Sequence, residues 1–295
     1  EFTAAALRIF NALGVILIFL TAKTIFGRSV GLIAALLFAF SFEQTQFSIY
    51  MGNPTLAVLS MMLMYLGLAL VIFSKKNQGL PLALLGFGAS VQFQFALTYL
   101  IIPLVSVLII YRKVFFKIPM RIWGLSFLAL VFSLLTFLIA EIKYNFPTLH
   151  GLLTLSHNPE KSLTNIFGTY FFTTSRMVMY NLSGNWPITL PVLLILAGFF
   201  VWLLRKKDLR LKLIFLGIWF FSLLITFAVN GGVADVTKDV PLYYPNVGVS
   251  ISLLIFMAFL INKVMSKYKS LGIVLISFIL FANISLIEVF NPKGN

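Results

Sequence analysis

Residues 205–229 read RKKDLRLKLIFLGIWFFSLLITFAV, a cluster of lysines and arginines that runs directly into an apolar stretch long enough to cross a membrane. The same order recurs along the chain, because 16 of the 22 Lys and Arg residues lie in every second gap between apolar stretches. Cytoplasmic loops retain Lys and Arg, so the basic gaps are expected inside and the acidic gaps outside. These basic residues are Lys23, Arg28, Lys75, Lys76, Arg112, Lys113, Lys117, Arg121, Arg205, Lys206, Lys207, Arg210, Lys212, Lys263, Lys267 and Lys269.

The composition indicates a membrane protein and narrows the classes of function. Hydrophobic residues make up 60% of the 295 residues, more than in a typical soluble domain. The net charge of +14 sits in short gaps at membrane edges and forms no continuous stripe, which argues against a nucleic acid partner and for contact with membrane lipid. With no cysteine, disulfides and thiolate metal sites are excluded. The chain begins Glu1-Phe2-Thr3 without Met, and we expect residues to be missing before Glu1.

The fold class predicted is all-α, a polytopic membrane helix bundle with a single transmembrane domain over residues 1–295. The stretch Gly79–Tyr111 is flanked by bases on both sides, so it is expected to turn back near Gln92, Gln94 and Thr98 as a hairpin. Counting it as two gives about ten membrane segments, with both termini outside. The apolar stretches are Ala4–Ala22, Val30–Phe42, Pro54–Phe73, Gly79–Tyr111, Ile122–Ala140, Trp186–Leu204, Leu211–Val229, Leu242–Ile261 and Leu271–Val289.

Residues 141–185 form the long extracytoplasmic loop of this interpretation. Within it, Leu163–Tyr180 has apolar residues at near-helical spacing and is expected to be an interfacial helix. Val30–Phe42 is too short to cross the membrane, and Glu43 follows it at once. Glu43 is therefore expected either in a protein-lined cavity below the outer surface or, if the helix simply ends early, solvated at the interface.

Candidate binding residues are sought on the outer side. Asn53-Pro54 begins a helix whose free N–H groups suit an anion, although plain capping is the favoured explanation of the pair, because every helix needs a start. Arg8 either snorkels outward or reaches into an outer cavity. We expect Arg8 and the Asn53 helix start to share that cavity with further acidic, basic and aromatic side chains. The acids are Glu43 and Glu141, the bases Arg176 and Lys238, and the aromatic residues, which suit a sugar or lipid, Tyr243 and Tyr244. The candidate substrate-binding residues are Arg8, Glu43, Asn53, Glu141, Arg176, Lys238, Tyr243 and Tyr244.

Several motifs are absent or weak. Neither a GxxxxGK[ST] nor a GxGxxG phosphate loop occurs, so no nucleotide cofactor is expected. His150, His157 and Glu160 lack the HExxH spacing, so we expect solvated loop histidines and no metal. Gly86-Phe87-Gly88 is expected to permit close helix packing. Asn181-Leu-Ser183 matches a glycosylation acceptor triplet.

Several segments together resemble one family. They are Arg8-Ile-Phe-Asn11-Ala-Leu-Gly14, Phe26-Gly27-Arg28 leading into Gly31-Leu-Ile-Ala-Ala-Leu-Leu, Tyr50 with Asn53-Pro54, Glu141-Ile-Lys-Tyr144-Asn145-Phe146-Pro147, and Pro241-Leu-Tyr-Tyr-Pro245. They resemble GT-C membrane glycosyltransferases that depend on polyprenyl-phosphate sugars, the class of the protein mannosyltransferase and aminoarabinose transferase relatives. Tyr144 stands where a histidine is expected.

The resemblance implies a GT-C-like fold, a polyprenyl-phosphate-linked sugar as donor, and inverting transfer to an extracytoplasmic acceptor. It implies a bacterial inner membrane with the active face outside. The first helix here looks like the family's second, so the catalytic base is expected upstream of Glu1. Two other classes stay open: a multi-span transporter or lipid-linked glycan flippase, and a polysaccharide ligase or polymerase.

Overall fold

The described part of the chain is helical throughout. A computed structural model describes residues 2–49, 54–147, 150, 163–230 and 248–290, and these contain no strand. This confirms the predicted all-α class. The helices are α1 (Phe2–Phe26), α2 (Arg28–Ala39), α3 (Phe42–Ile49), α4 (Pro54–Ser74), α5 (Gly79–Phe93), η1 (Phe95–Leu100), α6 (Ile101–Ile110), α7 (Arg112–Phe115), α8 (Met120–Lys143), α10 (Leu163–Val178), the π-helical segment η2 (Met179–Ser183), α11 (Trp186–Leu204), α12 (Lys207–Asn230), α13 (Val249–Lys267) and α14 (Lys269–Phe290).

The described residues provide fewer spans than the sequence pattern predicts. Six helices are long and apolar enough to cross a membrane, or up to seven if the bent pair of α2 and α3 is one span. About ten segments is therefore not confirmed. The reason is length: α5 has 15 residues and α6 has 10, and at about 1.5 Å per residue neither covers the roughly 30 Å hydrocarbon core. The helix α12 is not among the six.

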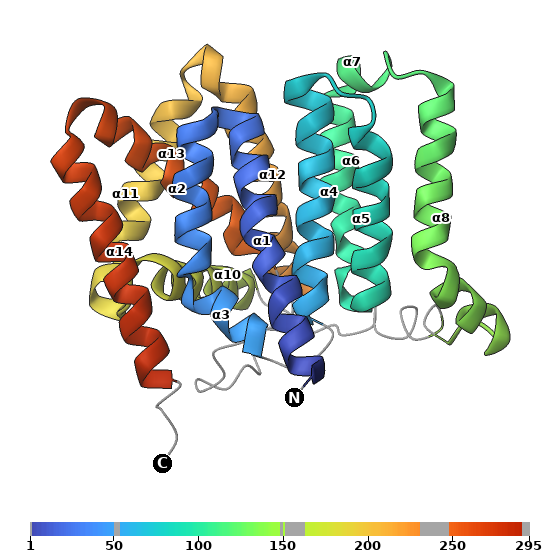
Figure 1. Ribbon diagram of the computed structural model, residues 1–295, viewed down its shortest axis with the longest axis horizontal. Coiled ribbons are helices and arrows are strands. Elements are labelled where there is room, and N and C mark those ends of the chain that lie inside the picture. Colours follow the sequence, from blue (N-terminus) through green and yellow to red (C-terminus); the bar gives the residue numbers. More distant parts are fainter. Residues whose placement is uncertain (1, 50–53, 148–149, 151–162, 231–247, 291–295) are drawn as a thin grey trace.

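The predicted hairpin within Gly79–Tyr111 is present. Helix α5 ends at Phe93, and Gln94 is extended, with φ −148° and ψ 104°. The short η1 follows, and α6 runs back to the end of the bundle at which α5 begins (Figure 1). The turn falls among the polar residues that interrupt the apolar stretch.

All five groups of basic residues lie at one end of the bundle. The α1–α2, α4–α5, α11–α12 and α13–α14 junctions share this end with α7, whereas α3, α10, the start of α1 and the end of α14 lie at the opposite end (Figure 1). The sequence pattern therefore identified one common face. Which side of the membrane this face occupies stays a prediction from the charge pattern.

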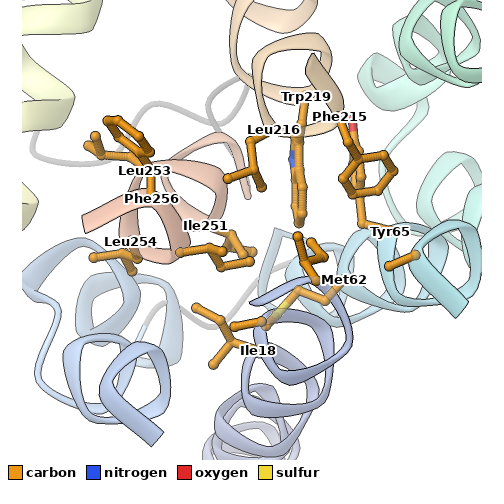
Figure 2. Close-up of a cluster of buried hydrophobic side chains, with 14 of the residues drawn as sticks. Ile18, Met62, Tyr65, Phe215, Leu216, Trp219, Ile251, Leu253, Leu254 and Phe256 are labelled. Carbon is orange, nitrogen blue, oxygen red and sulfur yellow. The ribbon is translucent and has the colours of Figure 1, made fainter. Parts of the chain in front are cut away.

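The core joins the first and second halves of the chain. The rings of Tyr65 from α4 and Trp219 from α12 stack, and Phe215 meets Tyr65 edge to face (Figure 2). Ile18 from α1 and Ile251 from α13 are buried in the same cluster. Because lipid is as apolar as these side chains, dispersion from close packing holds such a core together.

Glycines allow α4 and α5 to touch. A Cβ on Gly67 would lie 2.5 Å from both Ala83 N and Gly79 O, and a Cβ on Gly86 would meet Ser60 O and Met64 N of α4. A Cβ on Gly88 would meet Ser133 Oγ of α8. The expected packing role of Gly86 and Gly88 is confirmed, since side chains at these positions would push the helices apart.

Candidate functional site

The site is built around a break between α2 and α3, whose axes differ by 60°. Helix α2 ends at Ala39 and α3 begins at Phe42. Ser41 caps the new helix: its Oγ accepts a hydrogen bond from Gln44 N (3.2 Å), and its carbonyl accepts from Thr45 N (2.9 Å). Ser41-Phe-Glu-Gln44 is a capping-box sequence, a signal for a new helix that our sequence analysis missed.

Glu43 lies in the first turn of α3 and is buried, with 6% of its surface exposed. Asn181 Nδ2 donates a hydrogen bond to Glu43 Oε2, and Ser41 Oγ donates to Asn181 Oδ1 (2.7 Å). Of the two locations left open by the sequence, the structure favours the protein-lined one. Such a buried ionisable group is costly unless it is paired, and in membrane proteins it is a candidate for function.

Asn283 of α14 connects the two sides of this contact. Its Oδ1 accepts from Phe42 N (2.8 Å), the first N–H of α3, which has no partner within its own helix. Its Nδ2 donates to the carbonyl of Asn181 (3.0 Å) and to that of Ile279 (2.8 Å). One amide thus binds the backbone beside Glu43 and the backbone of Asn181.

Asn181 sits in the π-helical segment η2, all five residues of which are buried. Gly184 ends the segment in the left-handed region, with φ 74°, and its N–H donates to Met179 O (2.9 Å). Short π segments occur often at functional sites. The burial of Asn181 and Ser183 also rules out the glycosylation acceptor interpretation, because an acceptor asparagine must be reachable.

Helix α10 occupies most of the predicted interfacial helix, and it runs across the bundle at the end opposite the basic residues (Figure 1). Its last turns differ from the expectation of a helix lying only on the surface. Residues 173–178 are buried against the bundle, among them Arg176 with 6% of its surface exposed. The 141–185 region is therefore partly a structural element of the bundle, since α8 also extends to Lys143.

Arg176 supplies positive charge within electrostatic range of Glu43. The two groups interact electrostatically, and the guanidinium carbon lies 5.2 Å from the centre of the Tyr180 ring. Within the described residues, Arg176 Nη2 and Gln46 Nε2 are buried donors without a hydrogen-bond partner. A buried donor left unpaired costs about 1–3 kcal/mol, so such groups point to a ligand or a water that completes them.

The polar contacts extend to two more helices. Gln44 Nε2 donates to Ser250 Oγ of α13 (3.1 Å), and Asn11 Nδ2 of α1 donates to the Gln44 carbonyl (3.1 Å). We call the following residues the polar cluster: Asn11, Ser41, Glu43, Gln44, Arg176, Asn181, Ser250 and Asn283.

An apolar pocket of about 270 Å³ lies between α10, α11, α12 and α13. Thr174 and Val178 line it from α10, each two residues from Arg176, and at about 100° per residue this places the pocket and the guanidinium on opposite sides of the helix. Burial raises the pKa of the Tyr170 phenol at the pocket, so the ring stays neutral. The remaining lining residues are Phe171, Leu193, Leu194, Leu196, Ala197, Phe200, Leu216, Gly217, Phe220, Phe221, Ser252, Leu253 and Phe256.

The structure brings together only part of the predicted site. Glu43 and Arg176 are close enough to interact electrostatically. Arg8 is exposed on α1, and Glu141 is buried on α8, a helix that packs on α5 at the far side of the bundle from α3 (Figure 1). The packing of α8 on α5 sets Glu141 apart from α3. Helix α1 contacts α3, so a cavity shared by Arg8 and Glu43 stays a prediction.

The other predicted residues lie elsewhere in the chain. Asn53, Lys238, Tyr243 and Tyr244 fall outside the described residues, as do His157 and Glu160 of the weak metal set. Among the described residues, no group of three His, Cys, Asp or Glu side chains is arranged to hold a metal. Sequence reasoning missed Asn181, Ser250 and Asn283, whose partners are 100 or more residues away.

Residues 4–139 match the family model of dolichyl-phosphate-mannose-protein mannosyltransferases. This match supports a GT-C-like membrane glycosyltransferase. The match confirms the resemblance seen in the sequence and covers α1 to most of α8, including Ser41 and Glu43. Arg176, Asn181 and Asn283 lie beyond the matched region. No curated protein and no solved structure matches the chain.

Proposed function

We propose that this GT-C-like glycosyltransferase moves a sugar from a polyprenyl-phosphate donor to an acceptor on the extracytoplasmic side of a bacterial inner membrane, with inversion. The acceptor hydroxyl attacks C1 of the sugar, the bond from C1 to the phosphate oxygen breaks, and the hydroxyl proton passes to a carboxylate. The lipid phosphate leaves with its negative charge stabilised by a nearby cation.

The observation that carries this proposal is the buried pair of Glu43 and Arg176. In the proposed roles, Arg176 binds the donor phosphate through its unpaired Nη2. Glu43, held by Asn181, accepts hydrogen bonds from hydroxyl groups of the substrates. Both groups lie at the end of the bundle opposite the basic residues, which is the extracytoplasmic end if the charge pattern sets the orientation.

The apolar pocket supports a lipid-linked donor. Its lining is almost entirely hydrocarbon and aromatic, and it lies among helices of the membrane domain. We assign it to a segment of the donor's polyprenyl chain, with the head group passing around α10 toward Arg176. Asn53, Lys238, Tyr243 and Tyr244 keep their proposed role as substrate contacts.

The proposal is tested with purified full-length protein in lipid nanodiscs, incubated with polyprenyl phosphates that carry different single sugars. Release of free polyprenyl phosphate, measured by mass spectrometry, reports turnover. Arg176→Gln should raise the KM for the donor by about tenfold or more, the effect of losing a charged hydrogen bond worth roughly 1.5–3 kcal/mol. Arg121→Gln is the matched control, because Arg121 is exposed at the basic end. Equal donor kinetics for the two variants would contradict the role of Arg176.

One observation favours the transporter alternative. The α2–α3 pair is a broken helix with a buried charge at the break, an arrangement found in secondary transporters. In proteoliposomes, a flippase would move a lipid-linked sugar between leaflets without changing it chemically. Movement of intact donor with no release of polyprenyl phosphate, for every sugar tested, would establish that alternative.

A further inference from the structure

We infer that Asn283 is a positioning residue that sets the Glu43 carboxylate against the Asn181 amide. The two contacting side chains come from distant elements: Glu43 lies in the first turn of α3, directly after the helix break, and Asn181 lies in the π segment. The geometry within each element does not fix the position of α3 relative to η2. A third element must therefore hold them in register.

Asn283 has the chemistry for this task. Its carbonyl oxygen accepts from Phe42 N and its amide nitrogen donates to the Asn181 carbonyl, at 2.8 and 3.0 Å. Both contacts are with backbone atoms, one residue before Glu43 and at Asn181 itself. The amide is 2% exposed, so its bonds form away from competing water and are worth more than surface contacts.

The position in the chain makes the assignment specific. Asn283 belongs to the last helix, 102 residues from Asn181 and 241 from Phe42. It lies outside the region that matches the mannosyltransferase family model, whereas Glu43 lies inside it. Asn283 acts through Asn181 and the α3 backbone, and in the described contacts it does not touch the Glu43 carboxylate.

The first test reads the Glu43 carboxylate directly and needs no substrate. A hydrophobic carbodiimide modifies carboxyl groups in apolar surroundings, and mass spectrometry of the peptide that contains Glu43 gives the rate. Asn283→Ala should raise this rate about three- to tenfold, the factor that corresponds to losing about one net hydrogen bond. Asn262→Ala is the control, a change of the same kind at a half-buried position of α13.

A second variant separates positioning from loss of fold. Asn283→Asp keeps the shape and the acceptor for Phe42 N but removes the donor to Asn181. It should also raise the labelling rate, while size-exclusion profiles and melting curves identify any variant that fails to fold. If Asn283→Ala does not fold, Asn283→Asp decides. Labelling of Glu43 at the wild-type rate in a folded Asn283→Asp would overturn the inference.

The double variant tests whether Asn283 acts through Asn181. With Asn181→Ala in place, no amide remains for Glu43 to be aligned with, so adding Asn283→Ala should change the labelling rate little further. If the fold-changes in the Glu43 labelling rate caused by the two substitutions multiplied, the two residues would act independently, which would contradict the inference.

The catalytic consequence rests on the proposed function and is measured separately. In the donor assay, Asn283→Asp should lower kcat about tenfold and leave the KM for the lipid donor unchanged, since Asn283 contacts no substrate. An increase in KM with kcat unchanged would contradict a positioning role. If the wild-type protein shows no turnover, the proposed function fails, and the labelling experiment still decides the geometric inference.

Discussion

The rings of Tyr65 and Trp219 stack with their centroids 3.4 Å apart and their planes 2° from parallel, and both side chains are fully buried. Tyr65 lies in the half of the chain that matches the mannosyltransferase model, and Trp219 lies in the other half. This contact joins α4 to α12 at the centre of the bundle (Figure 2). It is one of the packing contacts between the two halves of the chain.

Replacing Trp219 by Ala should destabilise the bundle. In soluble cores such a change costs about 3–5 kcal/mol, and we expect less here because lipid competes with the core for apolar side chains. Trp202→Ala on α11, where the indole is half exposed, is the control. Thermal melting in detergent should show a clearly lower Tm for Trp219→Ala alone. Equal melting of the two variants would show that the stack contributes little.

Gly86→Ala should also destabilise the protein, because the new methyl group would meet backbone atoms of α4 and neither helix backbone can move without losing contacts. Gly124→Ala on α8 is the matched control, since a Cβ there meets nothing within 4 Å. The control should be neutral or slightly stabilising, because Ala has the higher helix propensity by about 1 kcal/mol. Melting curves of both variants test the expected opposite signs.

Single cysteines should reveal the sidedness of the bundle, and the natural chain has none to interfere. Cysteines at Lys75, Arg112 and Lys206 occupy exposed positions at the basic end, whereas Tyr144 is exposed at the other end of α8. An impermeant maleimide added outside intact cells should label only position 144. External labelling of position 206 would reverse the orientation and place the polar cluster on the cytoplasmic side.

Filling the apolar pocket should affect donors according to chain length. Ala197→Phe places a ring in the pocket, whereas Ile195→Phe lies on the same helix outside the lining. We expect Ala197→Phe to raise the KM for a long polyprenyl donor and to leave a short-chain analogue unaffected. The same KM change for both chain lengths, or no change with the long one, would remove the pocket from the donor site.

The sequence predicted the features that depend on local pattern. The basic gaps share one face, α4 begins at Pro54, and the α5–α6 turn falls at Gln94. The Ser41 and Gln44 capping box also signals the break before Glu43 from local sequence, and it was not used in predicting where the helices begin.

The polar cluster depends on contacts that no local pattern encodes. Asn181 and Glu43 are 138 residues apart, and the sequence of neither segment predicts a contact with the other. The same limitation applies to the expected place of Glu141 beside Glu43. Sharing the outer side of a membrane says nothing about which helices pack together, and α8 packs on α5 rather than near α3.

The polar cluster draws Asn11, Ser41, Glu43 and Gln44 from the family-matched part of the chain and Arg176, Asn181, Ser250 and Asn283 from the rest. The two parts can therefore change independently during evolution. Substitutions in α10, η2 or α14 alter the environment of Glu43 and leave the region that matches the family model unchanged. Exchanging residues 163–290 between distant homologues would replace the part of the polar cluster that comes from α10, η2, α13 and α14 and keep the Glu43 carboxylate. The substrate preference of such chimeras should then follow the homologue that supplies residues 163–290.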